Sequence, residues 1–147
     1  MEAWYDRIDN LYLNESPPRP LVNQNPDRFE FIQLGVEQCK ELVGHIIKQL
    51  SNLGEKKIVL TVSPVPLQVT FAGGDVICRN SYSKSVLRVV AELISNGNSN
   101  VDYFPSYEMV TSLGTLAYGE DNVHVRNVIV KEIVEHMVDC YTVAESV

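Results

Sequence analysis

The sequence lacks any long run of apolar residues. Its uninterrupted apolar stretches span only a few residues, whereas an α-helix needs about 20 to cross a bilayer. The N-terminal segment Met1–Asp6 has neither a basic region nor an apolar stretch, so it shows no secretory signal. We therefore expect a cytoplasmic protein that makes no contact with membranes.

Cysteine is also scarce. Cys39, Cys78 and Cys140 are widely spaced and form no Cys-x-x-Cys motif, so we interpret them as free thiols and not as a disulfide or zinc framework. His45 and His136 have no further ligands at metal-binding spacing. The sequence therefore predicts no metal site and no cofactor.

Positive charge is in short supply. Twelve Lys and Arg residues stand against 19 Asp and Glu residues, which gives a formal net charge of −7. Such a surface repels nucleic-acid phosphates, and no basic stripe reverses this locally, so we exclude nucleic acid as a partner. The 147 residues, 45% of them hydrophobic and 21% charged, suit one globular domain with a modest core.

The hydrophobic pattern predicts helices and strands in alternation. Apolar residues recur at three- and four-residue spacings from Val36 to Leu50, which indicates a helix that Gly54 would end. Residues 57–63 form a β-branched run without alternation, which is typical of a strand buried on both faces of a parallel sheet. Residues 101–104 are a shorter candidate strand. This alternation predicts an α/β fold.

Two further helices and one loop complete the pattern. Ser81 or Ser83 would begin the second helix, and Asn127 would cap the third. Residues 14–28 hold four of the seven prolines, so we expect an extended loop within a single domain. Two strands make a poor sheet. Either the sheet continues in residues that the chain lacks, or weaker strands lie near residues 3–13, 68–78 and 107–116.

The segment before the last helix carries the clearest candidate for chemistry. Asp121 lies three residues before His124, so the carboxylate can reach one imidazole nitrogen and leave the other as a general base. On spacing alone, a surface histidine beside an acidic loop is the more common interpretation. No metal or cofactor is needed for either.

Three long strings resemble the GSCFA family. They are Lys-Ile-Val-Leu-Thr-Val-Ser-Pro-Val-Pro-Leu at 57–67, Asn-Ser-Tyr-Ser-Lys-Ser-Val-Leu-Arg at 80–88 and Tyr-Phe-Pro-Ser-Tyr-Glu at 103–108. They occur in the family's order and are followed by the Asp-x-x-His motif. This family is similar to SGNH-type hydrolases, so the resemblance implies a flavodoxin-like three-layer parallel sheet with flanking helices, of which this chain holds part.

The resemblance also implies roles for individual residues. His124 would be the general base of an ester hydrolase and Asp121 its orienting carboxylate. Lys84 and Arg88, four apart on one helix, form either a solvated basic ridge or a contact to an anion or sugar. Two further candidates for lining a substrate site, where ligand-binding loops follow the strands of α/β sheets, are Tyr107 and Glu108.

One element of the family pattern is missing. The Gly-Ser-Cys-Phe-Ala string, whose Ser resembles the nucleophile, does not occur, and no local Ser stands in a nucleophile elbow. We therefore expect residues 1–147 to be the C-terminal part of one GSCFA-like domain, inactive alone. An intact relative would act on an O-acylated saccharide. Alternatively, the chain is a non-catalytic partner or binding module that completes its fold with an N-terminal half-domain or with itself. A degraded reading frame without function is a third interpretation.

Overall fold

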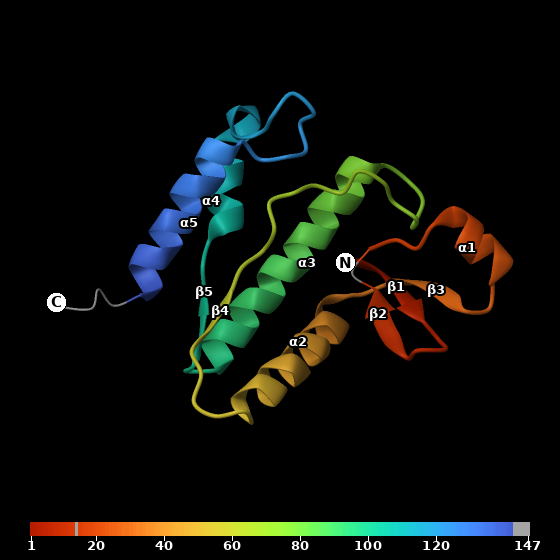
Figure 1. Ribbon diagram of the computed structural model, residues 1–147, viewed down its shortest axis with the longest axis horizontal. Coiled ribbons are helices and arrows are strands. Elements are labelled where there is room, and N and C mark those ends of the chain that lie inside the picture. The colour runs from red at the N-terminus through yellow and green to blue at the C-terminus, as the bar shows by residue number, and fades with distance from the viewer. Residues whose placement is uncertain (14, 143–147) are drawn as a thin grey trace.

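Two separate sheets organise the computed structural model, which describes residues 1–13 and 15–142 (Figure 1). The first is antiparallel, in the order β2-β1-β3, with β1 (Glu2–Asp6) between β2 (Leu11–Leu13) and β3 (Phe29–Gln33). Only residues 7–10 separate β1 from β2, and so short a connection permits only an antiparallel neighbour. A strand region near residues 3–13 is thereby confirmed, whereas β3 was not predicted.

The second sheet is a parallel pair. β4 (Ile58–Leu60) runs beside β5 (Val101–Tyr103), with Val59 opposite Asp102. The crossover between them contains the long helix α3 (Val76–Gly97), which packs against β5. Both strands lie within the predicted segments 57–63 and 101–104, which confirms those two predictions.

Helices lie on both sides of this strand pair. α2 (Val36–Ser51) packs against α3, while α5 (Asn127–Tyr141) lies on the other side of the strands (Figure 1). The Tyr141 hydroxyl donates to Asp102 Oδ2 over 2.7 Å, which ties α5 to β5. Both helices lie in predicted segments, although Arg126, and not Asn127, occupies the N-cap of α5 and the apolar residues of α5 are not buried as its pattern predicts.

The start of α3 differs from the prediction. Asp75 is its N-cap, and Asp75 Oδ1 accepts hydrogen bonds from the backbone N–H groups of Ile77 and Cys78 at 2.8 and 3.1 Å. Two glycines with positive φ, Gly73 and Gly74, allow the chain to turn immediately before this cap. The helix therefore begins at Val76, and the expected starts at Ser81 and Ser83 are wrong.

Four other expectations are corrected. The proline-rich segment 14–28 is not loop throughout, because it contains the short helix α1 (Arg19–Gln24), whose Pro20 lies in the first turn, where a missing N–H is harmless. Segment 68–78 contains no strand. Segment 107–116 is mostly helical, in α4 (Ser106–Ser112) and the 3₁₀ helix η1 (Gly114–Ala117).

Within the described residues the fold is mixed α/β, without the expected three-layer flavodoxin-like sheet, because the parallel sheet is only two strands wide.

The hydrophobic core lies between α2, α3 and the two sheets. Buried side chains from each of these elements form one cluster, which consists of Ala3, Leu34, Cys39, Ile47, Val86, Val90, Ile94 and Val101. By contrast, α5 has no buried residue. None of the described helices is both long and apolar enough to cross a membrane.

Candidate active site

The Asp-x-x-His motif lies in a tight loop between η1 and α5. An isolated antiparallel bridge between Tyr118 and Val125 closes the base of this loop. Inside it, Gly119 N–H donates to the His124 carbonyl over 2.8 Å, and Asn122 adopts a positive φ of 54° that completes the turn. Asparagine tolerates this left-handed conformation better than most residues. The backbone therefore holds the motif in a single compact turn.

Asp121 and His124 are joined by a side-chain hydrogen bond. Asp121 Oδ2 lies 2.5 Å from His124 Nδ1, while Oδ1 accepts the backbone N–H groups of Val123 and His124, both at 3.0 Å. The hydrogen bond from His124, supported by the two backbone N–H groups, holds the pKa of Asp121 below its usual range. With a proton on Nδ1, the imidazole presents the lone pair of Nε2 outward. The His124 side chain is 75% exposed, so this nitrogen is accessible.

A contact to the segment that follows β4 places this loop near the carboxyl end of the parallel strands. The Tyr118 hydroxyl donates to the Pro64 carbonyl over 3.1 Å, in the segment that follows β4. That segment is also bound to the start of α4, because Ser106 Oγ donates to the Val62 carbonyl at 3.2 Å and contacts Thr61 Oγ1. Ligand sites of open α/β sheets lie at this end of their strands.

Lys84 is buried and is not part of a solvated ridge. Its Nζ donates to the Ser63 carbonyl over 2.6 Å, and its side chain is only 7% exposed. No carboxylate of the described residues pairs with this ammonium, and burial lowers the pKa of Lys84. Lys84 thus binds the same post-β4 segment that Tyr118 contacts.

Arg88 and Glu108 bind each other. Arg88 Nε lies 2.6 Å from Glu108 Oε1, and the guanidinium also contacts Glu92 Oε2 at 2.8 Å. The Tyr103 ring lies under Arg88 with its centroid 4.2 Å from Cζ, and its hydroxyl donates to Glu108 Oε2 over 2.8 Å. Burial and the neighbouring Glu108 carboxylate raise the pKa of Tyr103. This network connects α3 to β5 and α4.

The predicted site residues therefore fall into separate groups. Asp121 and His124 form one group. Lys84 contacts the segment after β4, which Tyr118 also contacts, and Arg88 and Glu108 form a third group. Across the described part of the chain, no hydrogen bond or ion pair joins His124 to Lys84, Arg88 or Glu108. Tyr107 is half-buried on α4, where its carbonyl accepts the Thr111 hydroxyl at 2.7 Å.

Sequence reasoning missed Tyr118, Thr61 and Ser106 as residues that hold the site. A weak signal for Tyr118 exists, because an aromatic residue directly precedes the Gly-Glu-Asp turn. Thr61 and Ser106 lie 45 positions apart in the sequence, so no local pattern links them. Only the parallel pairing of β4 with β5 brings their hydroxyls together.

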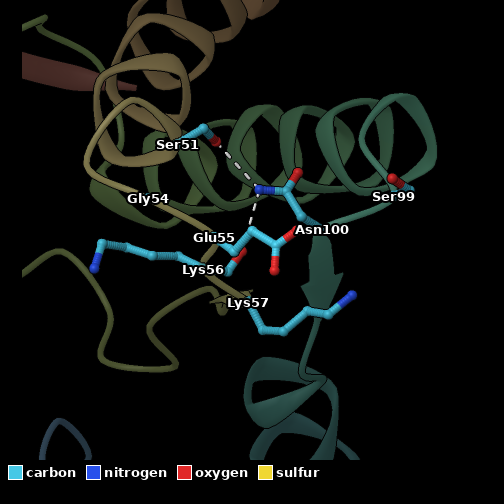
Figure 2. Close-up of a pocket in the computed structure, with 7 residues that line it drawn as sticks. All are labelled: Ser51, Gly54, Glu55, Lys56, Lys57, Ser99 and Asn100. Atoms are coloured by element: carbon cyan, nitrogen blue, oxygen red, sulfur yellow. Dashed lines mark hydrogen bonds between the residues drawn. The ribbon is translucent and has the colours of Figure 1, made fainter.

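A hollow of about 640 Å³ lies at the opposite end of the strand pair (Figure 2). Its wall includes Ser51 and Lys56, which are bridged by the Asn100 amide through hydrogen bonds of 3.2 and 3.3 Å to Ser51 Oγ and the Lys56 carbonyl. This hollow lies at the amino ends of β4 and β5, so it does not adjoin His124. In the residues that the structure describes, no three His, Cys, Asp or Glu side chains gather as metal ligands would.

Comparison with known proteins identifies one family. The sequence model of the GSCFA family matches residues 1–137, which is most of the chain. No curated protein matches the sequence, and no solved structure matches it either.

Proposed function

The chain belongs to the GSCFA family. On that premise we propose that His124 is the general base of an SGNH-type ester-hydrolase site and that Asp121 is the carboxylate that orients it. The hydroxyl nucleophile would come from another polypeptide segment, since the Gly-Ser-Cys-Phe-Ala string is not part of this sequence. The observation that carries the proposal is the 2.5 Å contact between Asp121 Oδ2 and His124 Nδ1.

The proposed reaction uses the exposed imidazole nitrogen. His124 Nε2 removes the proton from the nucleophilic hydroxyl as its oxygen attacks the ester carbonyl carbon. The resulting imidazolium is stabilised by Asp121 and then gives its proton to the departing alkoxide. A water molecule, deprotonated in the same way, releases the acid and restores the nucleophile. Asp121 binds Nδ1 of His124 and thereby orients Nε2 toward the nucleophilic hydroxyl.

The site would be completed by strands from the same additional segment. β4 pairs only with β5 among the described strands, so a flavodoxin-like sheet requires further strands beside this pair. As substrate we propose an O-acyl group on a saccharide, by analogy with the fold and the family alone. Contact of that substrate with Lys84, Arg88, Tyr107 or Glu108 stays a prediction, and use of the Arg88 guanidinium would have to compete with Glu92 and Glu108.

Complementation with a nucleophile segment tests this function. The chain alone should not turn over p-nitrophenyl acetate. Addition of an N-terminal segment from a family member that carries the Gly-Ser-Cys-Phe-Ala motif should produce hydrolysis, which should be lost with His124→Ala. His45→Ala removes another exposed imidazole, on α2, and should leave the activity unchanged. If the isolated chain hydrolysed the ester and His124→Ala abolished this activity, the claim that the nucleophile comes from another segment would be wrong. If both variants lost activity equally, the proposed role of His124 would be wrong.

A second candidate function is a non-catalytic binding module that pairs through β4. Ile58 N–H bonds to Asn100, and Leu60 accepts from Phe104 N–H, so the intervening Val59 directs its backbone groups away from β5. An open edge of this kind favours strand addition. Val59→Pro removes the donor on that edge and should abolish concentration-dependent association in size-exclusion chromatography. A monomer at all concentrations in the wild type would rule out self-association.

A further inference from the structure

A groove lined by aromatic side chains lies beside the antiparallel sheet. This sheet lies on the opposite side of α3 from α5, the helix that follows the Asp121–His124 loop (Figure 1). Trp4 of β1 packs edge-to-face against Phe31 of β3 and against Phe71, with ring centroids 5.6 and 5.2 Å apart. Phe71 lies in the segment before α3 and remains 43% exposed. We call this hollow the Trp4 groove. It encloses about 560 Å³ and is lined by Trp4, Pro17, Arg19, Val22, Asn23, Val69 and Phe71.

Among the described residues that line the Trp4 groove, Arg19 alone is charged. In the part of the chain that the structure describes, its guanidinium makes no hydrogen bond or ion pair. The other described arginines are all engaged with carboxylates or backbone carbonyls; they are Arg7, Arg28, Arg79, Arg88 and Arg126. A free guanidinium next to exposed apolar side chains fits a ligand that is anionic at one end and apolar along its body.

We propose that the Trp4 groove binds a small monocarboxylate with an apolar body, such as a medium-chain fatty acid. The planar guanidinium of Arg19 matches the two oxygens of a carboxylate. The side chains of Trp4, Val69 and Phe71 would cover the apolar body, as in most small-molecule sites. A single cation balances a single negative charge. A second anionic group would be repelled, because Glu2 and Glu15 line the adjoining hollow that shares Trp4 and Phe71.

Two observations concern the walls of the groove: Glu2 holds them in shape, and Trp4 carries a buried donor without an acceptor. Glu2 accepts from the Phe71 backbone N–H at 3.3 Å and also from the Thr70 hydroxyl, which attaches the Phe71 segment to β1. Trp4 Nε1 is shielded from solvent yet finds no acceptor among the described residues. Buried donors of this kind are uncommon in folded proteins, and a ligand oxygen would satisfy this one only if the Trp4 side chain turned toward the groove.

The chain contains one tryptophan, which lines both the Trp4 groove and the adjoining hollow, so its fluorescence reports on this part of the surface. We would titrate the full chain with sodium octanoate, with 1-octanol and with octylammonium chloride. Octanoate should produce a saturable change in Trp4 emission. Octanol, with the same apolar body but no charge, should bind more weakly, and octylammonium should bind most weakly of the three.

Three variants separate the charge from the apolar surface. Arg19→Gln should weaken octanoate binding about two- to fivefold, the range expected for an exposed ion pair, and should leave octanol binding unchanged. Arg7→Gln removes an exposed arginine that pairs with Glu30 elsewhere on the sheet and should have no effect. Val69→Asp places a carboxylate on a side chain that is 58% exposed, so it should fold normally, as checked by circular dichroism, and should abolish octanoate binding.

The proposal would be overturned if octanoate caused no saturable change. It would also be overturned if octanol bound as tightly as octanoate, or if Arg19→Gln behaved like Arg7→Gln. None of these measurements involves His124 or ester hydrolysis. Failure of the groove proposal therefore leaves the proposed function intact, and the reverse is also true.

Discussion

The body formed by α2 and α3 and the region formed by α5 and the Asp121–His124 loop are built differently. α3 alone buries several side chains, among them Val86, Val90 and Ile94, whereas α5 buries none. The loop is held mainly by hydrogen bonds to its own backbone and by Tyr118. Hydrophobic burial thus stabilises one region, and directional polar contacts shape the other. Substitutions of Asp121 or His124 should therefore leave the folded state largely intact.

The largest expected effect is in the hydrophobic core that α2 and α3 share with the two sheets, where Leu34 lies between β3 and α2. Leu34 is 2% exposed and belongs to the core cluster. Leu34→Ala should lower the free energy of unfolding by about 2–5 kcal/mol, because it removes buried methyl groups and leaves a cavity. Urea denaturation followed by circular dichroism measures this loss.

Val134→Ala is the matched change on α5. Val134 is 48% exposed, so its truncation should change the free energy of unfolding by less than about 0.5 kcal/mol. A loss comparable with that of Leu34→Ala would contradict the contrast between the two regions. It would mean that the apolar side of α5 is covered in solution, as a binding module would require.

The next effect concerns the connection between the regions. Tyr118→Phe removes the hydrogen bond to the Pro64 carbonyl and should reduce stability by about 0.5–1.5 kcal/mol. It should also speed hydrogen exchange of the Gly119 N–H in the loop more than that of the core helices. Tyr82→Phe, at a tyrosine that is 45% exposed on α3, is the control. Equal effects of the two variants would show that Tyr118 does not anchor the loop.

A smaller, pH-dependent effect should come from Lys84. Burial lowers the pKa of Lys84 from its ordinary value of 10.5, so the native state loses this proton at a lower pH than the unfolded state. Between those two values the unfolded state binds more protons, and stability rises with pH. Urea denaturation from pH 7 to pH 10 should show this rise in wild type but not in Lys84→Met. Lys131→Met, at a side chain that is 74% exposed, should retain the rise.

The smallest effect on stability should come from Asp121→Asn, because Asp121 is exposed and an amide oxygen can still accept the two backbone N–H groups. The pKa of Asp121 is lower in the folded state than in the unfolded state. Its carboxylate therefore stabilises the fold above the unfolded-state pKa, and this stabilisation is lost as the pH falls through the folded-state pKa. The clear change should be in His124, where ¹⁵N chemical shifts should report a proton held on Nδ1 in wild type and mixed tautomers in the variant. Unchanged shifts would show that Asp121 does not orient the imidazole.

Much of the fold follows from local pattern. The periodicity over 36–50 and after Asn127 predicts α2 and α5, and the β-branched run at 57–63 predicts β4. The errors arise where a short polar signal decides the outcome. Asp75 moves the start of α3 several residues upstream of Ser81, because its carboxylate caps two free N–H groups.

The candidate site divides in the same way. The Asp121–His124 hydrogen bond joins residues three positions apart, so their spacing permits it, and the resemblance to the GSCFA family favours it over a solvated histidine. The contacts of Lys84 and Arg88 are a different matter. Both lie on one helix at a four-residue spacing, yet Lys84 is buried against the Ser63 carbonyl and Arg88 is paired with Glu108. Their partners lie 21 and 20 residues away, beyond the range of helical periodicity.

By itself, the sequence determined where most helices and the strands β4 and β5 lie, and it placed Asp121 within reach of His124, because each of these depends on residues that are close together in the chain. Only the tertiary structure decided the width of the parallel sheet, the place of the His124 loop at the carboxyl ends of β4 and β5, and the assembly of the Trp4 groove from β1, α1 and the Phe71 segment. These features depend on contacts between distant residues, whose free energy is gained only when the whole chain packs.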